Sequence, residues 1–197
     1  EAVRNAVVEI GIGDTDIQFS WENLYAKNKE IVDVKADRFF FVPDRVDLTI
    51  EGAAPVIAKA MRYPGDEGRG LREIPFAGSI VVPKAELESG APMIRHKDLF
   101  NITVTRDGES FAARYAGDEL SQAREAKAPI IQWLPAGYGM PCTIRRADGD
   151  LNGICEPEVA NWKDRMVQFE RVGFSRIDAV KVVCIARRTS RKKSVRS

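Results

Sequence analysis

The fold of this chain is decided by one stretch, Ala36–Gly52, which reads ADRFFFVPDRVDLTIEG. A lone cation, Arg38, precedes the aromatic run Phe39–Phe41, and a Pro-Asp turn follows. Residues 45–51 then alternate between polar and apolar side chains. This period of two predicts a strand with one buried face and one solvated face.

Short runs of the same kind continue through most of the sequence. From residue 31 to residue 186 they are separated by Gly, Pro and Asp, and Asp107-Gly108 is a strong hairpin signal. The runs follow one another at intervals of about 8–12 residues, which predicts a β-sandwich or a barrel rather than an α/β sheet. We therefore expect a mainly β fold.

The aromatic run Phe39–Phe41 has two interpretations. Its rings could form a platform on which nucleic-acid bases stack, or they could belong to the core. Neighbouring residues of a strand face opposite sides of the sheet, so at least one of the three must be buried. We expect two rings in the core and the third free to stack.

Two short helices precede the strands. Residues 1–11 carry apolar side chains at helical spacing, and Thr15-x-x-Gln18 has the spacing of a capping box before a second helix. Two such helices bury little surface by themselves. We therefore interpret residues 1–30 as a helical connecting segment that packs against a preceding part of a longer protein.

Composition bounds the class of protein. The 197 residues, 44% of them hydrophobic, are typical of one sizeable domain or two small ones. No apolar run approaches the roughly 18 residues needed to span a bilayer. The three cysteines, Cys142, Cys155 and Cys184, form no CxxC pair, and their odd number argues against a disulfide framework. We therefore expect a cytoplasmic location, in a reducing compartment.

The net charge of +1 is unevenly distributed. Residues 187–197 hold six of the 30 basic residues and no acid, which leaves 24 basic against 29 acidic residues in the rest of the chain. We expect this tail to be disordered; it either contacts phosphate or acts as a solubilising end. A nucleic-acid binder with an acidic body must concentrate its remaining cations locally.

Two motifs resemble ligand sites without completing them. Residues 148–153, DGDLNG, match the first half of a calcium-binding EF-hand loop, but Val159 stands where a bidentate Glu is required. A hairpin turn explains these turn-forming residues better. The glycine-rich residues 64–70 lack the Gly-Lys-Ser/Thr ending of a phosphate loop and are also interpreted as a turn.

His96 is the one histidine of the sequence. A His-Cys or His-His metal set cannot be assembled, and a Ser-His-Asp triad would have to use this residue. It lies between Arg95 and Lys97 on an expected strand edge, so we expect a solvated or RNA-facing side chain. We predict no catalytic residue and no metal site on this chain.

Short segments along the whole sequence carry a resemblance. They are EAVRN at residues 1–5, SWENL at 20–24, PFAG at 75–78, IRHKDL at 94–99, IIQWL at 130–134 and VQFERVGF at 167–174. Together with Ala36–Gly52, and in this order, they resemble the C-terminal anticodon-binding region of the archaeal/eukaryotic-type glutamyl-tRNA synthetases. More distantly, they are similar to the glutaminyl-tRNA synthetases of the same class I family.

The resemblance implies two six-stranded β-barrels, stacked end to end after the helical segment. The chain would enter a proximal barrel, build a distal barrel and return. This implies a proximal barrel of residues 31–62 and 142–186, and a distal barrel of residues 63–141. The basic tail, residues 187–197, would follow.

The resemblance also implies a site that reads the tRNA anticodon. Arg38, Gln168 and Arg171 would lie together near the middle base, while Arg95 and Lys97 would approach the first base. The chemistry is consistent, because the splayed bases of an RNA loop are read by guanidinium forks and amide groups on their edges. The amide of Gln168 can both donate and accept.

The parent enzyme would use ATP and Mg²⁺ to attach glutamate to tRNA. The family's HIGH and KMSKS signatures are missing from this sequence, so we expect no aminoacylation and no cofactor on this chain. The expected partners are the glutamate-acceptor tRNA and the parent's own catalytic domain. The glutamine-acceptor tRNA and a tRNA-dependent amidotransferase are further candidates.

Two alternatives to anticodon binding stay open at the level of sequence. One is a free-standing pair of barrels that holds proteins together, in an assembly with an amidotransferase or other synthetases. The other is a barrel module that binds ribosomal RNA.

Overall fold

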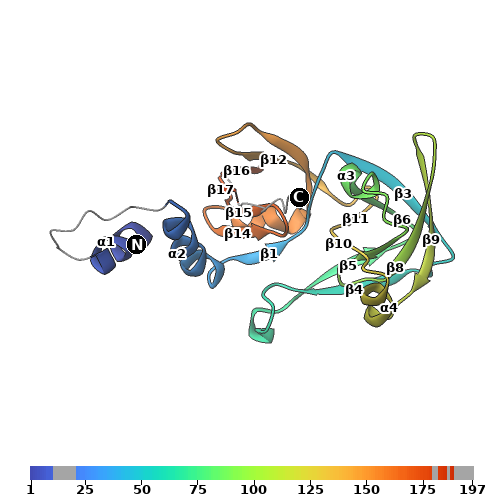
Figure 1. The fold of residues 1–197 in the computed structure, drawn as a ribbon, viewed down its shortest axis with the longest axis horizontal. Helices are drawn as coiled ribbons and strands as arrows, with labels where there is room; N and C mark the ends of the chain where they lie inside the picture. The colour runs from blue at the N-terminus through green and yellow to red at the C-terminus, as the bar shows by residue number, and fades with distance from the viewer. Residues whose placement is uncertain (11–20, 179–181, 186, 189–197) are drawn as a thin grey trace, which may run out of the picture.

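The computed structural model describes residues 1–10, 21–178, 182–185 and 187–188. Helix α1 (Ala2–Ile10) and helix α2 (Trp21–Asp33) lie at one end of the long axis (Figure 1). They pack on each other through Ala2 and Leu24. The two helices expected before the strands are confirmed, whereas the predicted capping box lies outside the described residues. No helix in the described part of the chain is long and apolar enough to cross a membrane.

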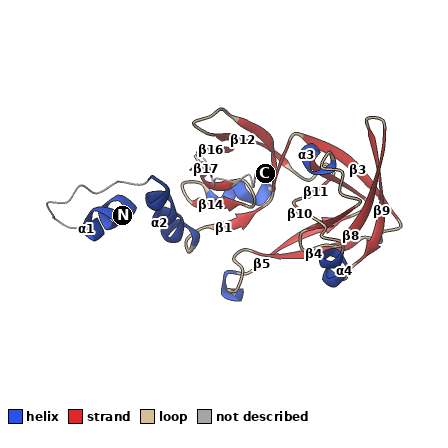
Figure 2. Cartoon of the chain, viewed as in Figure 1, coloured by secondary structure: helices blue, strands red, loops and turns tan. Residues whose placement is uncertain are grey.

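Short strands make up most of the remaining described residues (Figure 2). They are β1 (Asp37–Phe39), β2 (Phe41–Pro43), β3 (Arg45–Glu51), β4 (Val56–Met61), β5 (Leu71–Phe76), β6 (Ser79–Pro83), β7 (Met93–His96), β8 (Asn101–Asp107), β9 (Ser110–Gly117), β10 (Ile130–Ile131), β11 (Leu134–Pro135), β12 (Met140–Arg145), β13 (Leu151–Cys155), β14 (Met166–Phe169), β15 (Gly173–Arg176), β16 (Val182–Ile185) and β17 (Arg187–Arg188). Between them lie helices α3 (Lys84–Leu87) and α4 (Leu120–Glu125) and the 3-10 turns η1 (Glu67–Arg69) and η2 (Pro157–Trp162). The mainly β fold is confirmed.

The described strands form four sheets. The largest has seven strands in the order β10-β7-β8-β9-β3-β6-β11, and the hairpin β4-β5 lies with it. Two four-stranded sheets, β1-β14-β15-β17 and β16-β12-β13-β2, form the middle of the molecule. The first two residues of the basic tail thus form β17, and residues 189–197 lie outside the described part.

Two hydrophobic cores underlie these sheets. The large core consists of Phe40, Val42, Leu48, Ile50, Ala58, Ala60, Ile74, Phe76, Ile80, Val81, Val82, Leu87, Ile94, Phe100, Ile102, Ala113, Ile131, Trp133, Leu134 and Ile154. The small core consists of Phe39, Phe41, Cys142, Ile144, Cys155, Val159, Val167, Phe169 and Ile177. We call β3–β11 with α3 and α4 the large body, and β1, β2 and β12–β17 the small body. Residues 39–42 contribute side chains to both cores.

The run Phe39–Phe41 joins the two cores. Successive strand residues point in opposite directions, so Phe39 and Phe41 enter the small core while Phe40 enters the large one. The three rings are 0%, 0% and 1% exposed. The interpretation that one ring is free to stack on bases is therefore wrong.

Two local predictions are confirmed. In β3, Leu48 and Ile50 are buried while the polar residues between and beside them are exposed, as the period of two indicates. Residues 148–153 form part of the turn between the antiparallel strands β12 and β13 and the beginning of β13. Arg146 holds that turn by donating to the Gly149 carbonyl and pairing with Asp148.

Candidate nucleic-acid interface

Arg38 and Gln168 lie opposite each other on neighbouring parallel strands. The register of β1 and β14 pairs these two residues directly, although they are far apart in the sequence. Both side chains are partly exposed. Nε of Arg38 and Oε1 of Gln168 are buried atoms without a hydrogen-bond partner among the described residues. Two residues in direct register thus each keep one polar atom without a partner among the described residues.

Polar and aromatic groups surround the Arg38 guanidinium. It lies 3.6 Å from Asp33 of α2 and 5.4 Å from the centre of the Tyr63 ring. The guanidinium of Arg69 lies 4.9 Å from the same ring. Tyr63 also donates to Asp33, with an oxygen–oxygen distance of 3.3 Å. The loop before β5 therefore places an aromatic ring near two cations beside β1.

Arg171 follows β14 in the tight turn to β15 and has a positive φ of 60°. Its guanidinium is directed to the large body, where it lies 2.7 Å from Glu86 of α3 and donates to the carbonyl of Ile130. The structure thus joins Arg38 and Gln168 as neighbours, while the interactions of Arg171 lead away from them.

The guanidinium of Arg95 donates hydrogen bonds to oxygen atoms of the large body, to which Arg95 itself belongs. Its Nη1 donates to Asn101 at 2.9 Å and to the Asp118 carbonyl at 3.0 Å, and its Nη2 donates to the Leu99 carbonyl. These bonds fix the guanidinium against the segments that follow β7 and β9.

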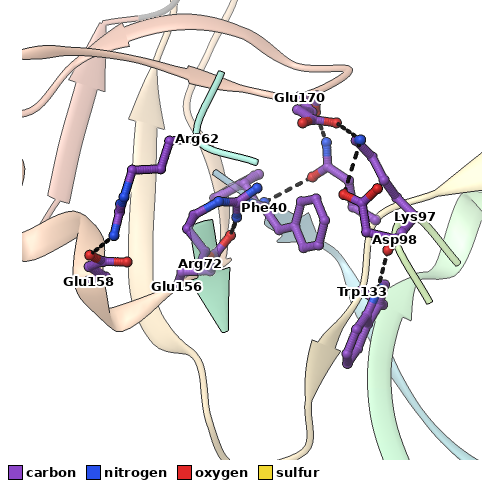
Figure 3. A network of polar contacts seen from close by, with 11 residues as sticks. Phe40, Arg62, Arg72, Lys97, Asp98, Trp133, Glu156, Glu158 and Glu170 are labelled. Atoms are coloured by element: carbon purple, nitrogen blue, oxygen red, sulfur yellow. Dashed lines mark hydrogen bonds and ion pairs between the residues drawn. The ribbon is translucent and has the colours of Figure 1, made fainter. Parts of the chain in front are cut away.

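Lys97 reaches from the large body to the end of β14. Its ammonium lies 3.2 Å from Asp98 and 3.7 Å from Glu170 (Figure 3). Burial raises the pKa of Glu170, and the nearby Lys97 opposes that effect. The structure therefore brings Lys97 next to the Gln168–Arg171 segment.

A buried polar network joins the bodies beneath this surface (Figure 3). Glu156 accepts the N–H of Phe40 at 2.6 Å and pairs with Arg72 of β5. Gln132 accepts the N–H of Phe41 at 2.9 Å and donates to the Glu170 carbonyl. The backbone that passes between the cores is thereby held by side chains on either side of it.

Arg72 and Glu156 were missed at the level of sequence. Both side chains are 1% exposed, and burial raises the pKa of Glu156 to about 7 against the opposing effects of Arg72 and the Phe40 N–H. One signal was present, because Arg72 shares its strand face with the apolar Ile74 and Phe76. A cation on such a face predicts a buried ion pair. No pattern marks Glu156.

His96 is a core residue, so the expectation of a solvated or RNA-facing side chain is wrong. It shares the buried face of β7 with Ile94, while Arg95 lies on the opposite face. Its ring lies edge-on to Phe100 and Trp133. Burial, with the nearby Arg95, lowers the pKa of His96 to about 3, so the imidazole is neutral.

Two family models match the chain, over residues 36–115 and residues 130–178. Both are described as "tRNA synthetases class I (E and Q), anti-codon binding domain". The chain belongs to this family. The resemblance that the short segments indicated is therefore confirmed.

Curated relatives agree with the family models. A glutamate–tRNA ligase of Methanospirillum hungatei is 69% identical over 179 residues, which are 91% of this chain and 32% of that protein. Those of Methanoculleus marisnigri and Methanosarcina mazei are 56% and 40% identical, again over 91% of this chain and 32% of theirs. The chain thus spans about a third of the length of these relatives.

All five residues of the predicted site lie within the two matched ranges. They are Arg38, Arg95, Lys97, Gln168 and Arg171. In this anticodon-binding domain, segments of both bodies meet at the end of β14, where Lys97 contacts Glu170 and Arg171 contacts Glu86. The arrangement offers guanidinium, ammonium and amide groups, which can hydrogen-bond and pair with RNA.

Proposed function

We propose that this chain is the anticodon-binding region of a glutamate–tRNA ligase and that Arg38 and Gln168 read an anticodon base. The observation that carries this proposal is their direct register on β1 and β14, where both side chains are partly exposed. Membership of the family supplies the class of ligand.

The geometry suits a single unstacked base. Neighbouring strands are about 4.8 Å apart, so a guanidinium and an amide on adjacent strands can reach two atoms of the same base edge. Proteins read RNA sequence mostly in loops, whose bases are splayed and expose their hydrogen-bonding edges. Arg38 supplies donors only, whereas Gln168 supplies both a donor and an acceptor.

The remaining site residues have supporting roles in this proposal. Lys97 lies beside the Gln168–Arg171 segment and would contact the first anticodon base or its phosphate. Arg95 would act at the same base after exchanging some of its present oxygen partners for RNA. Arg171 would turn from Glu86 toward the RNA.

We infer that each body is barrel-like, with the small body proximal to α2 and the large body distal. The support is that each hydrophobic core is enclosed by more than one sheet. Six strands in each barrel, the division at residue 62 and disorder of the basic tail stay predictions from sequence.

The activity of the parent is part of the proposal. A catalytic domain outside this chain would bind ATP and Mg²⁺ and attach glutamate to tRNA in the cytoplasm, while this chain would hold no cofactor. The glutamate-acceptor tRNA is the proposed ligand. The absence of a basic, Gln-containing segment between Glu88 and Met93 favours it over the glutamine acceptor. Contact with an amidotransferase stays a prediction.

Titration of the full chain with tRNA tests the proposal. We expect binding of the glutamate-acceptor tRNA that weakens steeply between 50 and 200 mM salt, because phosphate contacts release counterions. Six to ten phosphate contacts would lower the affinity by about 10³-fold or more over this range. A competing ribosomal RNA fragment should displace it poorly. Absence of tRNA binding at 50 mM salt would favour the alternative of a pair of barrels that holds proteins together. Stronger binding of the ribosomal fragment would favour the alternative of a module that binds ribosomal RNA.

A further inference from the structure

The ion pair between Arg171 and Glu86 crosses from one body to the other. Arg171 belongs to the β14–β15 turn of the small body, and Glu86 belongs to α3 of the large body. The nitrogen–oxygen distance is 2.7 Å. The pair is therefore a direct contact between a proposed RNA-binding cation and an acid that the sequence places 85 positions away.

Partial exposure makes this pair displaceable. The side chains of Arg171 and Glu86 are 34% and 23% exposed, whereas those of Arg72 and Glu156 are 1% exposed. An ion pair in contact with water contributes little free energy, because water and salt compete for both charges. A ligand can thus take Arg171 from Glu86, while the Arg72–Glu156 pair is out of its reach.

Glu86 offers the guanidinium the same chemistry as RNA. A carboxylate presents two oxygen acceptors to the planar fork of donors, and so do a phosphate and a base edge with two acceptors. Arg171 cannot bind both partners with the same N–H donor. An RNA group that takes the Nη2 donor directed at Glu86 must first replace the carboxylate.

We propose that Glu86 competes with RNA for the guanidinium of Arg171. This inference rests on the proposed function, because it assumes that tRNA reaches Arg171. The acid keeps the guanidinium occupied in the free protein and restricts it to RNA acceptors that bind it more strongly than a carboxylate does. The ligand chemistry is a pair of RNA hydrogen-bond acceptors, either on a base edge or on a phosphate.

The chain offers a matched control on the same helix end. Glu88 follows α3 directly and pairs with Lys84 at 3.7 Å. Glu86→Gln and Glu88→Gln remove the same charge within two residues of each other, but only the first removes the ion-pair partner of Arg171, which keeps its hydrogen bond to the Ile130 carbonyl. Glu86→Asp keeps the charge and shortens the side chain by one methylene, which withdraws the carboxylate from the guanidinium.

The experiment measures the affinity of the full chain for glutamate-acceptor tRNA at low salt. We expect Glu86→Gln to bind the tRNA about two- to five-fold more tightly, the factor that corresponds to one surface ion pair. Glu86→Asp should show part of this increase in tRNA affinity, and Glu88→Gln should show a smaller increase than Glu86→Asp. In an Arg171→Ala background, Glu86→Gln should add nothing, because the competed cation is gone.

A second arm identifies the RNA group. A tRNA with a scrambled anticodon keeps the phosphates and changes the bases. A gain limited to the natural anticodon assigns Arg171 to a base edge, and an equal gain for both tRNAs assigns it to a phosphate. Either result supports competition at Arg171.

Other outcomes overturn the inference. Unchanged or weaker binding by Glu86→Gln would show that the pair only joins the two bodies. An equal gain in Glu88→Gln, or an undiminished gain in the Arg171→Ala background, would show a general charge effect. If the wild-type chain bound no tRNA at all, the proposed function would fall together with this inference, whereas the preceding outcomes leave the proposed function intact.

Discussion

Replacing His96 by leucine should stabilise the protein. His96 is completely buried, and neither ring nitrogen has a hydrogen-bond partner among the described residues. A neutral imidazole carries one N–H donor, and a buried donor without an acceptor costs about 1–3 kcal/mol. Leucine has a similar volume and no polar atom, so we expect a gain of about 1–3 kcal/mol in the free energy of unfolding at pH 7.5.

The gain should grow as the pH falls. The pKa of His96 is lowered from 6.5 to about 3 in the folded protein. Between these values the unfolded chain binds a proton that the folded protein does not bind, so the free energy of unfolding of the wild type falls progressively as the pH drops through 6.5. One proton corresponds to about 1.4 kcal/mol per pH unit. Between pH 6.5 and pH 4.5 the wild type should lose about 2.3 kcal/mol that the leucine variant keeps.

Urea denaturation of the wild type and His96→Leu at pH 7.5, 5.5 and 4.5 measures the difference between their free energies of unfolding. The other titrating groups are the same in both proteins, so their contributions cancel in this difference. Because His96 is the one histidine of the sequence, its imidazole C–H signals in a proton NMR spectrum are also unambiguous. They should not titrate between pH 8 and pH 4.5. A titration near pH 6.5, or stability profiles that run parallel for the two proteins, would refute the reasoning.

Two further changes test the junction between the cores. Burial raises the pKa of Glu156 from 4.5 to about 7, so the folded protein holds a proton that the unfolded chain releases, and wild-type stability should fall as the pH rises through this window. In urea denaturation, the free energy of unfolding of Glu156→Gln relative to that of the wild type should rise by about 3 kcal/mol from pH 4.5 to pH 7.5. If this difference between the two proteins stayed constant with pH, it would contradict the raised pKa. A Cβ at Gly153 would lie 2.4 Å from the Val42 carbonyl oxygen, so Gly153→Ala should lose about 1–3 kcal/mol in thermal unfolding. Gly68→Ala, which meets only a flexible Asp66 side chain, should lose clearly less, and equal losses would argue against a close approach of the strands.

The sequence predicted those features that depend on local pattern. The alternation in β3 set its buried face, and the turn residues at 148–153 gave a hairpin because they need no distant partner. Family resemblance placed Arg38 beside Gln168, a pairing that no local pattern contains.

The failures at Phe39–Phe41 and at Glu86 have a shared physical cause, which is contact with a second body. Phe39–Phe41 is buried on both faces because a core lies on each side of it, and no strand pattern reports a second core. His96 was assigned to the surface because it stands between two cations, yet its strand face is shared with Ile94. Glu86 was missed because its partner arrives from a distant turn.

The most direct test of base reading is the ratio of affinities for tRNA with the natural anticodon and tRNA with a scrambled anticodon. If Arg38 and Gln168 read a base, Gln168→Ala should lower this ratio by about 5- to 150-fold, the range of a good bidentate base contact. Arg165→Ala, which removes an exposed cation just before β14, should leave the ratio unchanged. An unchanged ratio in Gln168→Ala would contradict the account, because the residue would then contribute to RNA binding without distinguishing one base from another.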